Sequence, residues 1–514
     1  MIRESCANDE GNERQERGPR LRIKHLWLGL PVFLLICKAS VFPLPLLDFW
    51  WHLKMGEVIA STGSIPRTDI FSFTAAGQPF IIHNWLAEVI YYGVYRTGGF
   101  PLLIGFNVLL LVAALLPVCY LCRKATVELW IAVASAGLAA FGMFCNMRPQ
   151  VFSFVLFSLF LWALADYRDR RRDWLWALPP LMALWVNLHG AFVVGLGLMA
   201  LILVCETTRS LMTRAGSNRL SKLQLAKLGI VLLLCAIATL ANPEGYSVYT
   251  YISTVLHDPS SQLFVIEWQP PRIDTIQGAL LFYLPFFLSI VILIYAKEAP
   301  NLTDLALFLC FAAFGLTATR NSIWFLLVNS PLVARFLTST GWPKSLPILR
   351  RGRRGTVSYE WLNYLILGMA TVIIIMFSPW LQPRLFQTSL LEAKTPVAAV
   401  DYIEKSSMEG NIFHPQIYGD YLIWRLWPRH RAYFDGRVHL YGEGFVRNYQ
   451  RIFRDTHWEE LLEKQNIRHL LLDKDGDARW GSERLIKEAR ESGRWRLLYE
   501  DELSALLEKV RIED

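Results

Sequence analysis

The sequence predicts an α-helical membrane protein of about eleven spans that carries a small α/β domain at its C-terminal end. The composition supports this class, since 53% of the 514 residues are hydrophobic and only 19% are charged. The mean hydropathy of +0.30 agrees. A soluble globular chain has a more polar surface than this composition allows. Apolar runs of helical length also follow one another as far as about residue 382.

The predicted spans lie near residues 26–47, 100–121, 127–145, 150–166, 174–189, 190–205, 227–241, 276–296, 303–319, 322–338 and 360–381. A polar, Arg-rich arm at residues 1–25 precedes the first span, and no small-residue cleavage site follows that span. We therefore expect the first span to be retained. Residues 26–382 are predicted to form one transmembrane domain.

The net charge of +8 reports orientation in such a chain rather than a nucleic-acid partner. Lys and Arg concentrate in the N-terminal arm and in alternate loops such as YRDRRRD (167–173) and PKSLPILRRGRRG (343–355). This asymmetry places the N-terminus and those loops on the cytoplasmic side of the membrane, while the spans contact membrane lipids. An odd number of spans then places residues 383–514 on the outer side.

Residues 383–514 change character and predict a small extracytoplasmic α/β domain. Short β-like runs (NIFHP, RAYFDGR, RHLLLD, WRLLYED) alternate with helical ones (YGDYLIWRLW, GFVRNYQRIF, WEELLEKQ).

Polar clusters gather on the outer side of this predicted topology, whereas the inner loops show only generic basic charge. They are DFWWH (48–52), NMRPQ (146–150), WVNLHG (185–190), ANPEGY (241–246), residues 257–272 and TATRNS (317–322). Ionisable groups near hydrocarbon cost about 2.5–3.5 kcal/mol on insertion scales, so several at one depth indicate a site.

The first outer loop, residues 48–99, holds the strongest candidates for catalysis. If residues 48–58 form an interfacial helix, Asp48 and His52 lie one turn apart on one face, while Trp50 and Trp51 point toward lipid as boundary anchors. An Asp beside an imidazole acts as a general base or holds a cation.

A second amphipathic helix in IIHNWLAEVIYYGVY is predicted to bring further polar groups back to the same depth. His83 and Glu88 are supporting candidates, and Asn84 shares a helical face with Glu88. The alternative for His52 and His83 is that they only satisfy buried polar groups.

Two arginines end outward-running spans, Arg148 and Arg320, and a guanidinium suits phosphate. The alternative for each is snorkelling to lipid headgroups. His189 is a further donor candidate and Asn187 a supporting one, both in WVNLHG. Glu267 and Trp268 are expected in an outer loop that covers a substrate.

The first outer loop and the outer C-terminal domain resemble the GT-C glycosyltransferases, which include oligosaccharyltransferases, protein O-mannosyltransferases and lipid A aminoarabinose transferases. DFWWHLKMGEVI, IPRTDIFSFTAAGQPFIIHNWLAEV, WVNLHG and YGDYLIWRLWPRHRAYFDGR are similar to a group of bacterial GT-C-like membrane proteins. The resemblance implies the bacterial inner membrane and a donor sugar linked to polyprenyl phosphate.

The resemblance also implies that Asp48 is the base or metal ligand of the first outer loop. Many GT-C enzymes have two adjacent acids there, but Phe49 follows Asp48 in this chain. Asp69 or Glu88 is the candidate for the second role. A divalent cation, Mg²⁺ or Mn²⁺, is left open as a cofactor.

The predicted function is transfer of a sugar or related group from a polyprenyl-phosphate carrier to an extracytoplasmic acceptor, a glycan, lipid or protein. The C-terminal motifs YGDY and FDGR contribute Tyr418, Asp420, Asp435 and Arg437, either to acceptor recognition and closure of the site or to a structural turn. The alternatives are a transporter or flippase of lipid-linked saccharides and a non-catalytic GT-C-like scaffold. Polar clusters at one boundary rather than at mid-membrane favour the enzyme over the transporter.

The predicted topology is tested by single cysteines placed in the six outer segments of an otherwise cysteine-free chain. We expect a membrane-impermeant thiol reagent to label all six from outside intact cells, and a cysteine in residues 167–173 to stay unlabelled. Labelling of the outer segments from opposite sides of the bilayer would contradict the topology.

Overall fold

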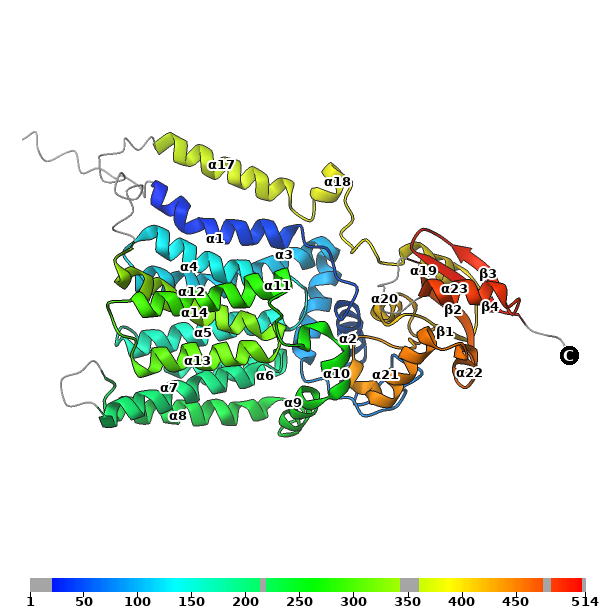
Figure 1. Ribbon diagram of the computed structural model, residues 1–514, viewed down its shortest axis with the longest axis horizontal. Helices are drawn as coiled ribbons and strands as arrows, with labels where there is room; N and C mark the ends of the chain where they lie inside the picture. The colour runs from blue at the N-terminus through cyan, green and yellow to red at the C-terminus, as the bar shows by residue number, and fades with distance from the viewer. Residues whose placement is uncertain (1–20, 213–218, 343–359, 475–481, 511–514) are drawn as a thin grey trace, which may run out of the picture.

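Long helices that run side by side form the larger part of the molecule, and a domain with a four-stranded sheet lies beyond one end of them (Figure 1). The computed structural model describes residues 21–212, 219–342, 360–474 and 482–510. Most of the predicted N-terminal arm and parts of two predicted inner loops lie outside these ranges.

Each predicted span coincides with a helix or a run of short helices in the described part of the chain. These are α1 (Ile23–Ser40), α3 (Trp85–Ala125), α4 (Leu129–Gly142), α5 (Gln150–Arg168), η1 (Leu175–Ala177) with α6 (Leu178–Leu188), α7 (Phe192–Met212), α8 (Lys222–Ala238) with η2 (Thr239–Ala241), α11 (Ile276–Gly278) with η4 (Ala279–Tyr283) and α12 (Leu284–Tyr295), α13 (Leu302–Thr317), α14 (Ser322–Thr340) and α17 (Glu360–Met376). Among the described residues, seven helices are long and apolar enough to cross a membrane, and four shorter apolar helices accompany them. The predicted fold class is confirmed, and the number of crossings stays a prediction.

The first span ends earlier than predicted. Helix α1 stops at Ser40 rather than near residue 47, because Pro43 and Pro45 follow and cannot donate backbone hydrogen bonds to a continuing helix. The extended segment instead forms a parallel bridge between Leu44 and Leu391. The chain therefore reaches Asp48 along the segment that leads into the C-terminal domain.

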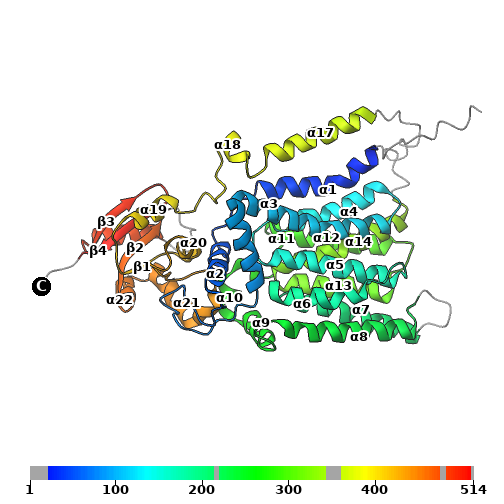
Figure 2. The same ribbon diagram turned by 180° about the vertical axis from the view of Figure 1, so that it is seen from behind.

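Helix α2 (Phe49–Thr62) lies across the end of the long helices, between them and the C-terminal domain (Figures 1 and 2). It packs against α3 on one side and α20 (Gln416–Leu426) on the other. Gly56 permits this approach, because a Cβ there would lie only 2.1 Å from the Glu88 carbonyl oxygen. The contact brings α2 against the first turn of α3.

The prediction that Trp50 and Trp51 face lipid is wrong. Their exposed fractions are 1% and 7%, because α20 covers the side of α2 that the sequence left open. The Trp50 ring packs edge-on against Phe100 at 5.6 Å and against Tyr421 at 5.0 Å between ring centroids. These tryptophans belong to the junction between the two parts of the molecule.

The second predicted interfacial helix forms the first turns of α3. Gly98 and Gly99 interrupt the helical backbone, and Gly99 has φ +66° and ψ −162°, a conformation open in practice only to glycine. Residues 85–97 thus take their own direction at the end of the bundle before the span that begins at Phe100. Helix α3 also packs against α1, α4, α5 and α14, which places it at the centre of the long helices.

Several connections on the same side as α2 contain short helices. They are α9 (Ser247–His257), α10 (Pro259–Phe264), η3 (Ile266–Trp268) and η5 (Thr319–Asn321). The linker to the C-terminal domain contains α18 (Gln382–Phe386).

The C-terminal domain is a mixed sheet with helices, as predicted, but one strand was assigned wrongly. The strands β1 (Asn411–Phe413), β2 (Ile467–Asp473), β3 (Trp495–Glu500) and β4 (Ser504–Lys509) have the order β1-β2-β4-β3, with only β1 and β2 parallel. The helices are α19 (Val397–Lys405), α20, α21 (Val438–Arg454), α22 (Trp458–Glu463) and α23 (Ser482–Glu491). The RAYFDGR segment (431–437) is not a strand of this sheet. It forms an isolated bridge to Ser72 of the first outer loop.

A buried ion-pair cluster joins that segment to the first outer loop. The Arg437 guanidinium donates to Asp69 at 2.6 Å and to both carboxylate oxygens of Asp435 at 3.0 and 2.5 Å. Tyr441 donates to Asp435 at 2.6 Å, and Asp69 also accepts from the Ser72 amide. The cluster is satisfied on all sides and fixes the C-terminal domain to residues 69–72.

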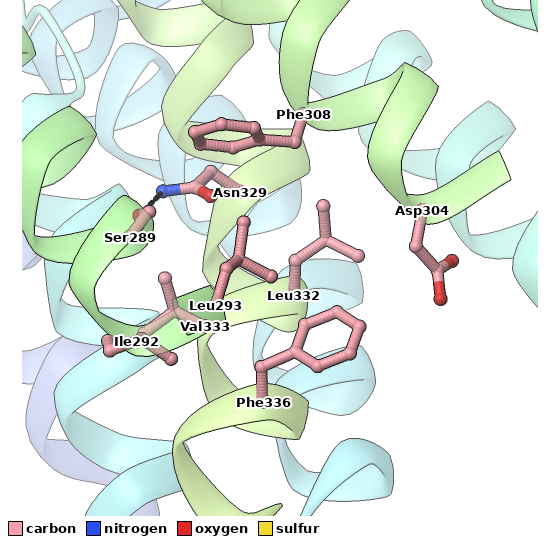
Figure 3. Close-up of a pocket in the computed structure, with 9 residues that line it drawn as sticks. All are labelled: Ser289, Ile292, Leu293, Asp304, Phe308, Asn329, Leu332, Val333 and Phe336. Carbon is pink, nitrogen blue, oxygen red and sulfur yellow. Dashed lines mark hydrogen bonds between the residues drawn. The ribbon is translucent and has the colours of Figure 1, made fainter. Parts of the chain in front are cut away.

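A small void of about 10 Å³ lies between α12, α13 and α14 (Figure 3). The Asn329 amide there donates to Ser289 at 2.8 Å among apolar side chains. A void of this size holds one water at most. It therefore serves packing rather than ligand binding.

We expect Arg437→Leu to destabilise the protein by about 3–5 kcal/mol, because it leaves two buried carboxylates without their cation. Thermal unfolding of the purified full-length protein in detergent measures this. Arg447→Leu, which removes an exposed ion pair with Glu443 on the same domain, is the matched control and should cost at most about 1 kcal/mol. Equal losses for the two variants would contradict a structural role for the cluster.

Candidate active site

A cavity of about 1060 Å³ opens where the long helices, α2 and the C-terminal domain meet. Five of the six polar segments that the sequence placed at one boundary contribute to its lining. The sixth, ANPEGY, supports it from behind, since Asn242 donates to the carbonyl oxygens of His83 and Val186 at 3.0 Å each. The segments are therefore brought together as predicted, and the chemical role of each residue stays a prediction.

One end of the cavity is charged. The Arg148 guanidinium lies 3.1 Å from Asp48 and donates to Glu267 at 2.6 Å. Arg320 stacks over the Trp268 ring at 4.6 Å, and no carboxylate of the described residues lies within ion-pair distance of it. Glu267 and Trp268, from η3, line this end of the cavity, and their cover of a substrate stays a prediction.

The electrostatics of this end differ from one carboxylate to the other. Burial raises the pKa of Asp48, although Arg148 opposes the shift. Burial alone would raise the pKa of Glu267 as well, but the positive charges of Arg148 and Arg320 outweigh this effect. The pKa of Glu267 is therefore lowered. Asp48 is therefore the better proton acceptor of the two near neutral pH.

Asp48 is held by the C-terminal domain. Its backbone has φ +64° and ψ −48°, which is unusual for a residue with a side chain. Its amide donates to Asp420 of α20 at 2.6 Å, and the Gly436 amide donates to the other Asp420 oxygen at 2.9 Å. The sequence placed Asp420 in acceptor recognition, whereas its observed contact is to the backbone of Asp48.

His52 is oriented by two residues at the start of α3. Its Nδ1 lies 2.8 Å from a Glu88 oxygen and 3.3 Å from the Asn84 amide nitrogen. Glu88 is buried behind the imidazole, which lines the cavity. Since Nδ1 is engaged, Nε2 is the nitrogen of His52 that is available to a ligand. Asp48 and His52 share a helix end, but their side chains bind different partners.

The remaining candidates fall into two groups. His83 and His189 line the cavity, and Asn187 accepts from the Trp85 indole at 2.8 Å behind it. Asp69 and Asp435 are bound to Arg437, and Tyr418 donates to the Leu503 carbonyl at 3.3 Å inside the C-terminal domain. Asp69 therefore serves the junction, and Arg437 reaches both the junction and the cavity.

Phe80, Tyr251 and His439 also line the cavity, and the sequence did not single them out. Tyr251 and His439 are hydrogen-bonded at 2.8 Å. Each is an ordinary residue of an amphipathic or aromatic-rich stretch, so the local pattern carried no signal. Only the position of α21 against α9 reveals their common surface.

The carboxylates of the charged end, Asp48 and Glu267, are both engaged by a guanidinium. In the described part of the chain, no group of three His, Cys, Asp or Glu side chains is arranged to hold a divalent cation. The guanidinium is that of Arg148, which already supplies the positive charge between the two carboxylates. The chemistry below is accordingly assigned to side chains.

The cavity continues as an apolar limb between α7 and α13. Val194, Leu198 and Leu201 line it from α7, and Phe311 and Phe314 line it from α13. Residues 193–201 span eight helical steps, so the limb extends about 12 Å along the bundle. Exposed side chains at residues 310 and 317 leave it open. An apolar chain thus has a path from the bundle to the charged end.

No protein-family model matches the chain, and no curated protein matches it. Solved structures do. The archaeal oligosaccharyltransferase AglB from Archaeoglobus fulgidus, in complex with an inhibitory peptide and a dolichol-phosphate, has 14% sequence identity and a TM-score of 0.55 over 87% of this chain and 69% of that chain. The apo form of the Archaeoglobus fulgidus oligosaccharyltransferase has 13% sequence identity and a TM-score of 0.53 over 87% of this chain and 69% of that chain.

ArnT from Cupriavidus metallidurans, bound to undecaprenyl phosphate, has 12% identity and a TM-score of 0.45 over 95% of this chain and 98% of that chain. The likeness to the oligosaccharyltransferase structures is one of fold. The chain therefore shares its fold with these oligosaccharyltransferase structures.

We expect Gly436→Ala to release the Asp48 amide, because the new Cβ would lie 2.4 Å from Asp48 Oδ1 and 2.8 Å from Asp420 Oδ2. Hydrogen–deuterium exchange of peptides covering residues 46–52 should accelerate by about tenfold or more, as for loss of a hydrogen bond to a charged group. Gly444→Ala is the matched control in α21, since a Cβ there meets nothing within 4 Å. Unchanged exchange in Gly436→Ala would contradict this expectation, because it would show that the segment around Gly436 shifts without breaking the hydrogen bond of the Asp48 amide.

Proposed function

We propose that this protein is a GT-C-type glycosyltransferase that moves a sugar from a polyprenyl-phosphate carrier to an acceptor on the outer side of the membrane. The observation that carries the proposal is the continuity of the cavity: an apolar limb leads to Arg148, Arg320 and Asp48. A lipid chain, a phosphate and a base are the three elements that such a reaction brings together.

The carrier phosphate binds at the arginines in this proposal. Arg148 is already shared by Asp48 and Glu267, whereas Arg320 stacks on the Trp268 ring and makes no ion pair with a carboxylate of the described residues. An arginine without a carboxylate partner attracts an anion strongly in a site of low dielectric. Arg320 is thus the primary phosphate ligand, and Arg148 supports it while orienting Asp48.

The reaction is a direct displacement at the anomeric carbon. Asp48 accepts the proton of an acceptor hydroxyl as the new glycosidic bond forms, and the bond between the anomeric carbon and the phosphate oxygen breaks. The electron pair of that bond leaves with the polyprenyl phosphate, where Arg320 and Arg148 stabilise the added negative charge. The raised pKa of Asp48, caused by burial, suits this step near neutral pH.

The AglB structure supports this proposal as an analogy, since it is a complex with a dolichol-phosphate. In this proposal the carrier phosphate lies at the charged end of the cavity, beside the apolar limb. The acceptor enters from the side of the C-terminal domain, where Gly436 lines the cavity.

The binding test uses purified full-length protein in nanodiscs and undecaprenyl phosphate. We expect Arg320→Met to weaken binding by about tenfold or more, as for loss of a buried charge-assisted contact. Arg272→Met is the control, because Arg272 belongs to the same outer connection but is exposed and pairs with Asp274. Equal binding by wild type and Arg320→Met would remove the arginine from phosphate recognition.

The catalytic test uses Asp48→Asn, which keeps the size of the side chain and the backbone amide that Asp420 binds. We expect this variant to bind undecaprenyl phosphate normally and to lose sugar transfer from a radiolabelled carrier by about 100-fold or more. Unchanged transfer would exclude Asp48 as the base. Movement of the labelled carrier across the bilayer without transfer would instead favour a flippase.

A further inference from the structure

A row of five rings forms one side of the cavity, next to its charged end. Phe80, His439, Tyr251, His83 and His189 follow one another with ring centroids 6.1, 5.6, 5.3 and 6.5 Å apart. All five line the cavity. They come from four separate parts of the chain and are called the ring wall below.

The hydrogen bonds around His189 define its proton. Its Nδ1 accepts from the Ala191 amide at 3.2 Å and lies 2.9 Å from the Ser153 hydroxyl. That hydroxyl accepts from the Trp185 indole at 2.7 Å, which leaves its own proton for His189. Because Nδ1 is an acceptor, the proton of the neutral ring is on Nε2. His189 therefore offers a donor.

The Tyr251 hydroxyl and His439 Nε2 are 2.8 Å apart. This pair fixes both rings and leaves the second nitrogen of His439 and a lone pair of Tyr251 for other partners. The ring wall thus offers neutral donors and acceptors between aromatic faces.

The ring wall carries no charge near neutral pH. Burial lowers the pKa of His83 and of His439 to about 4 each, and Nδ1 of His189 is occupied as a hydrogen-bond acceptor. Arg437 also lines the cavity, but Asp69 and Asp435 already neutralise it. The charges of the cavity are therefore confined to the end that holds Asp48, Glu267, Arg148 and Arg320.

We propose that the ring wall binds the sugar of the donor and that this sugar is uncharged. The inference rests on the proposed function, since it assigns the group that the carrier brings. Sugar hydroxyls match the neutral imidazoles and the tyrosine hydroxyl, and the apolar face of a pyranose ring packs on aromatic rings.

A charged sugar finds no partner on the ring wall. An ammonium group needs a carboxylate, but Asp48 and Glu267 are paired with Arg148. A carboxylate on the sugar needs a cation, and it would compete with the carrier phosphate for Arg320. A buried charge without a partner is costly, so the cavity selects against both kinds of sugar.

The test compares three donors that differ only in the sugar: undecaprenyl phosphate bearing glucose, glucosamine with a free ammonium, or glucuronic acid. Binding to the full-length protein in nanodiscs is measured by competition against undecaprenyl phosphate. We expect the glucose ester to bind with a dissociation constant lower by about tenfold or more than either charged ester. Equal affinity of the three esters, or preference for a charged one, would overturn the inference.

Two variants locate the selectivity. Tyr251→Phe and His439→Phe keep the rings and remove their hydrogen-bonding groups, and His457→Phe on the exposed side of the C-terminal domain is the control. We expect the first two to weaken binding of the glucose ester by about tenfold and to leave undecaprenyl phosphate within about twofold of wild type. Equal weakening of both ligands would assign the rings to carrier binding or to folding and overturn the inference.

The two proposals fail in different ways. If wild type does not bind undecaprenyl phosphate, the proposed function falls and the inference falls with it. If undecaprenyl phosphate binds and depends on Arg320, but the three esters are not distinguished, only the assignment of the ring wall is wrong.

Discussion

The arrangement of the site depends on one buried guanidinium, that of Arg437. It neutralises Asp69 of the first outer loop and Asp435 of the C-terminal domain at the same time. Two buried carboxylates facing each other would repel the two parts, so the arginine determines that they meet. Next to it in sequence, Gly436 and His439 line the cavity, and Gly436 shares Asp420 with the amide of Asp48. The C-terminal domain is thus a structural part of the cavity.

Polarity changes in steps along the cavity. The limb between α7 and α13 is apolar, the end at Arg148 and Arg320 is charged, and the side at Tyr251 and His439 is polar without charge. An amphiphilic ligand can satisfy all three regions only in one orientation. The cavity therefore favours one orientation of such a ligand, because each part of the ligand is stabilised only in the region that matches its polarity.

The sequence was sufficient to predict those features that depend on hydrophobic periodicity or on the free-energy cost of placing polar groups near hydrocarbon. The apolar runs located the long helices, and the polar ends of those runs located five segments of the cavity lining. The local sequence pattern gave a wrong prediction where the environment of a residue is determined by a segment distant in the sequence. Trp50 is buried because α20 covers it, and RAYFDGR leaves the sheet because its Arg and Asp bind across the junction. The left-handed backbone of Asp48 has no signature in a side chain that normally avoids it.

The contacts that complete the site join residues very far apart along the chain. The Asp48 amide and Asp420 are separated by 372 positions, and Asp69 and Arg437 by 368. A ribosome makes the first outer loop long before it makes the residues that hold it, and domains fold as units in the order of synthesis. The nascent protein consequently has an incomplete cavity, which is completed only when the last quarter of the polypeptide has been made and has docked. A complete cavity thus reports that synthesis of the whole polypeptide has finished.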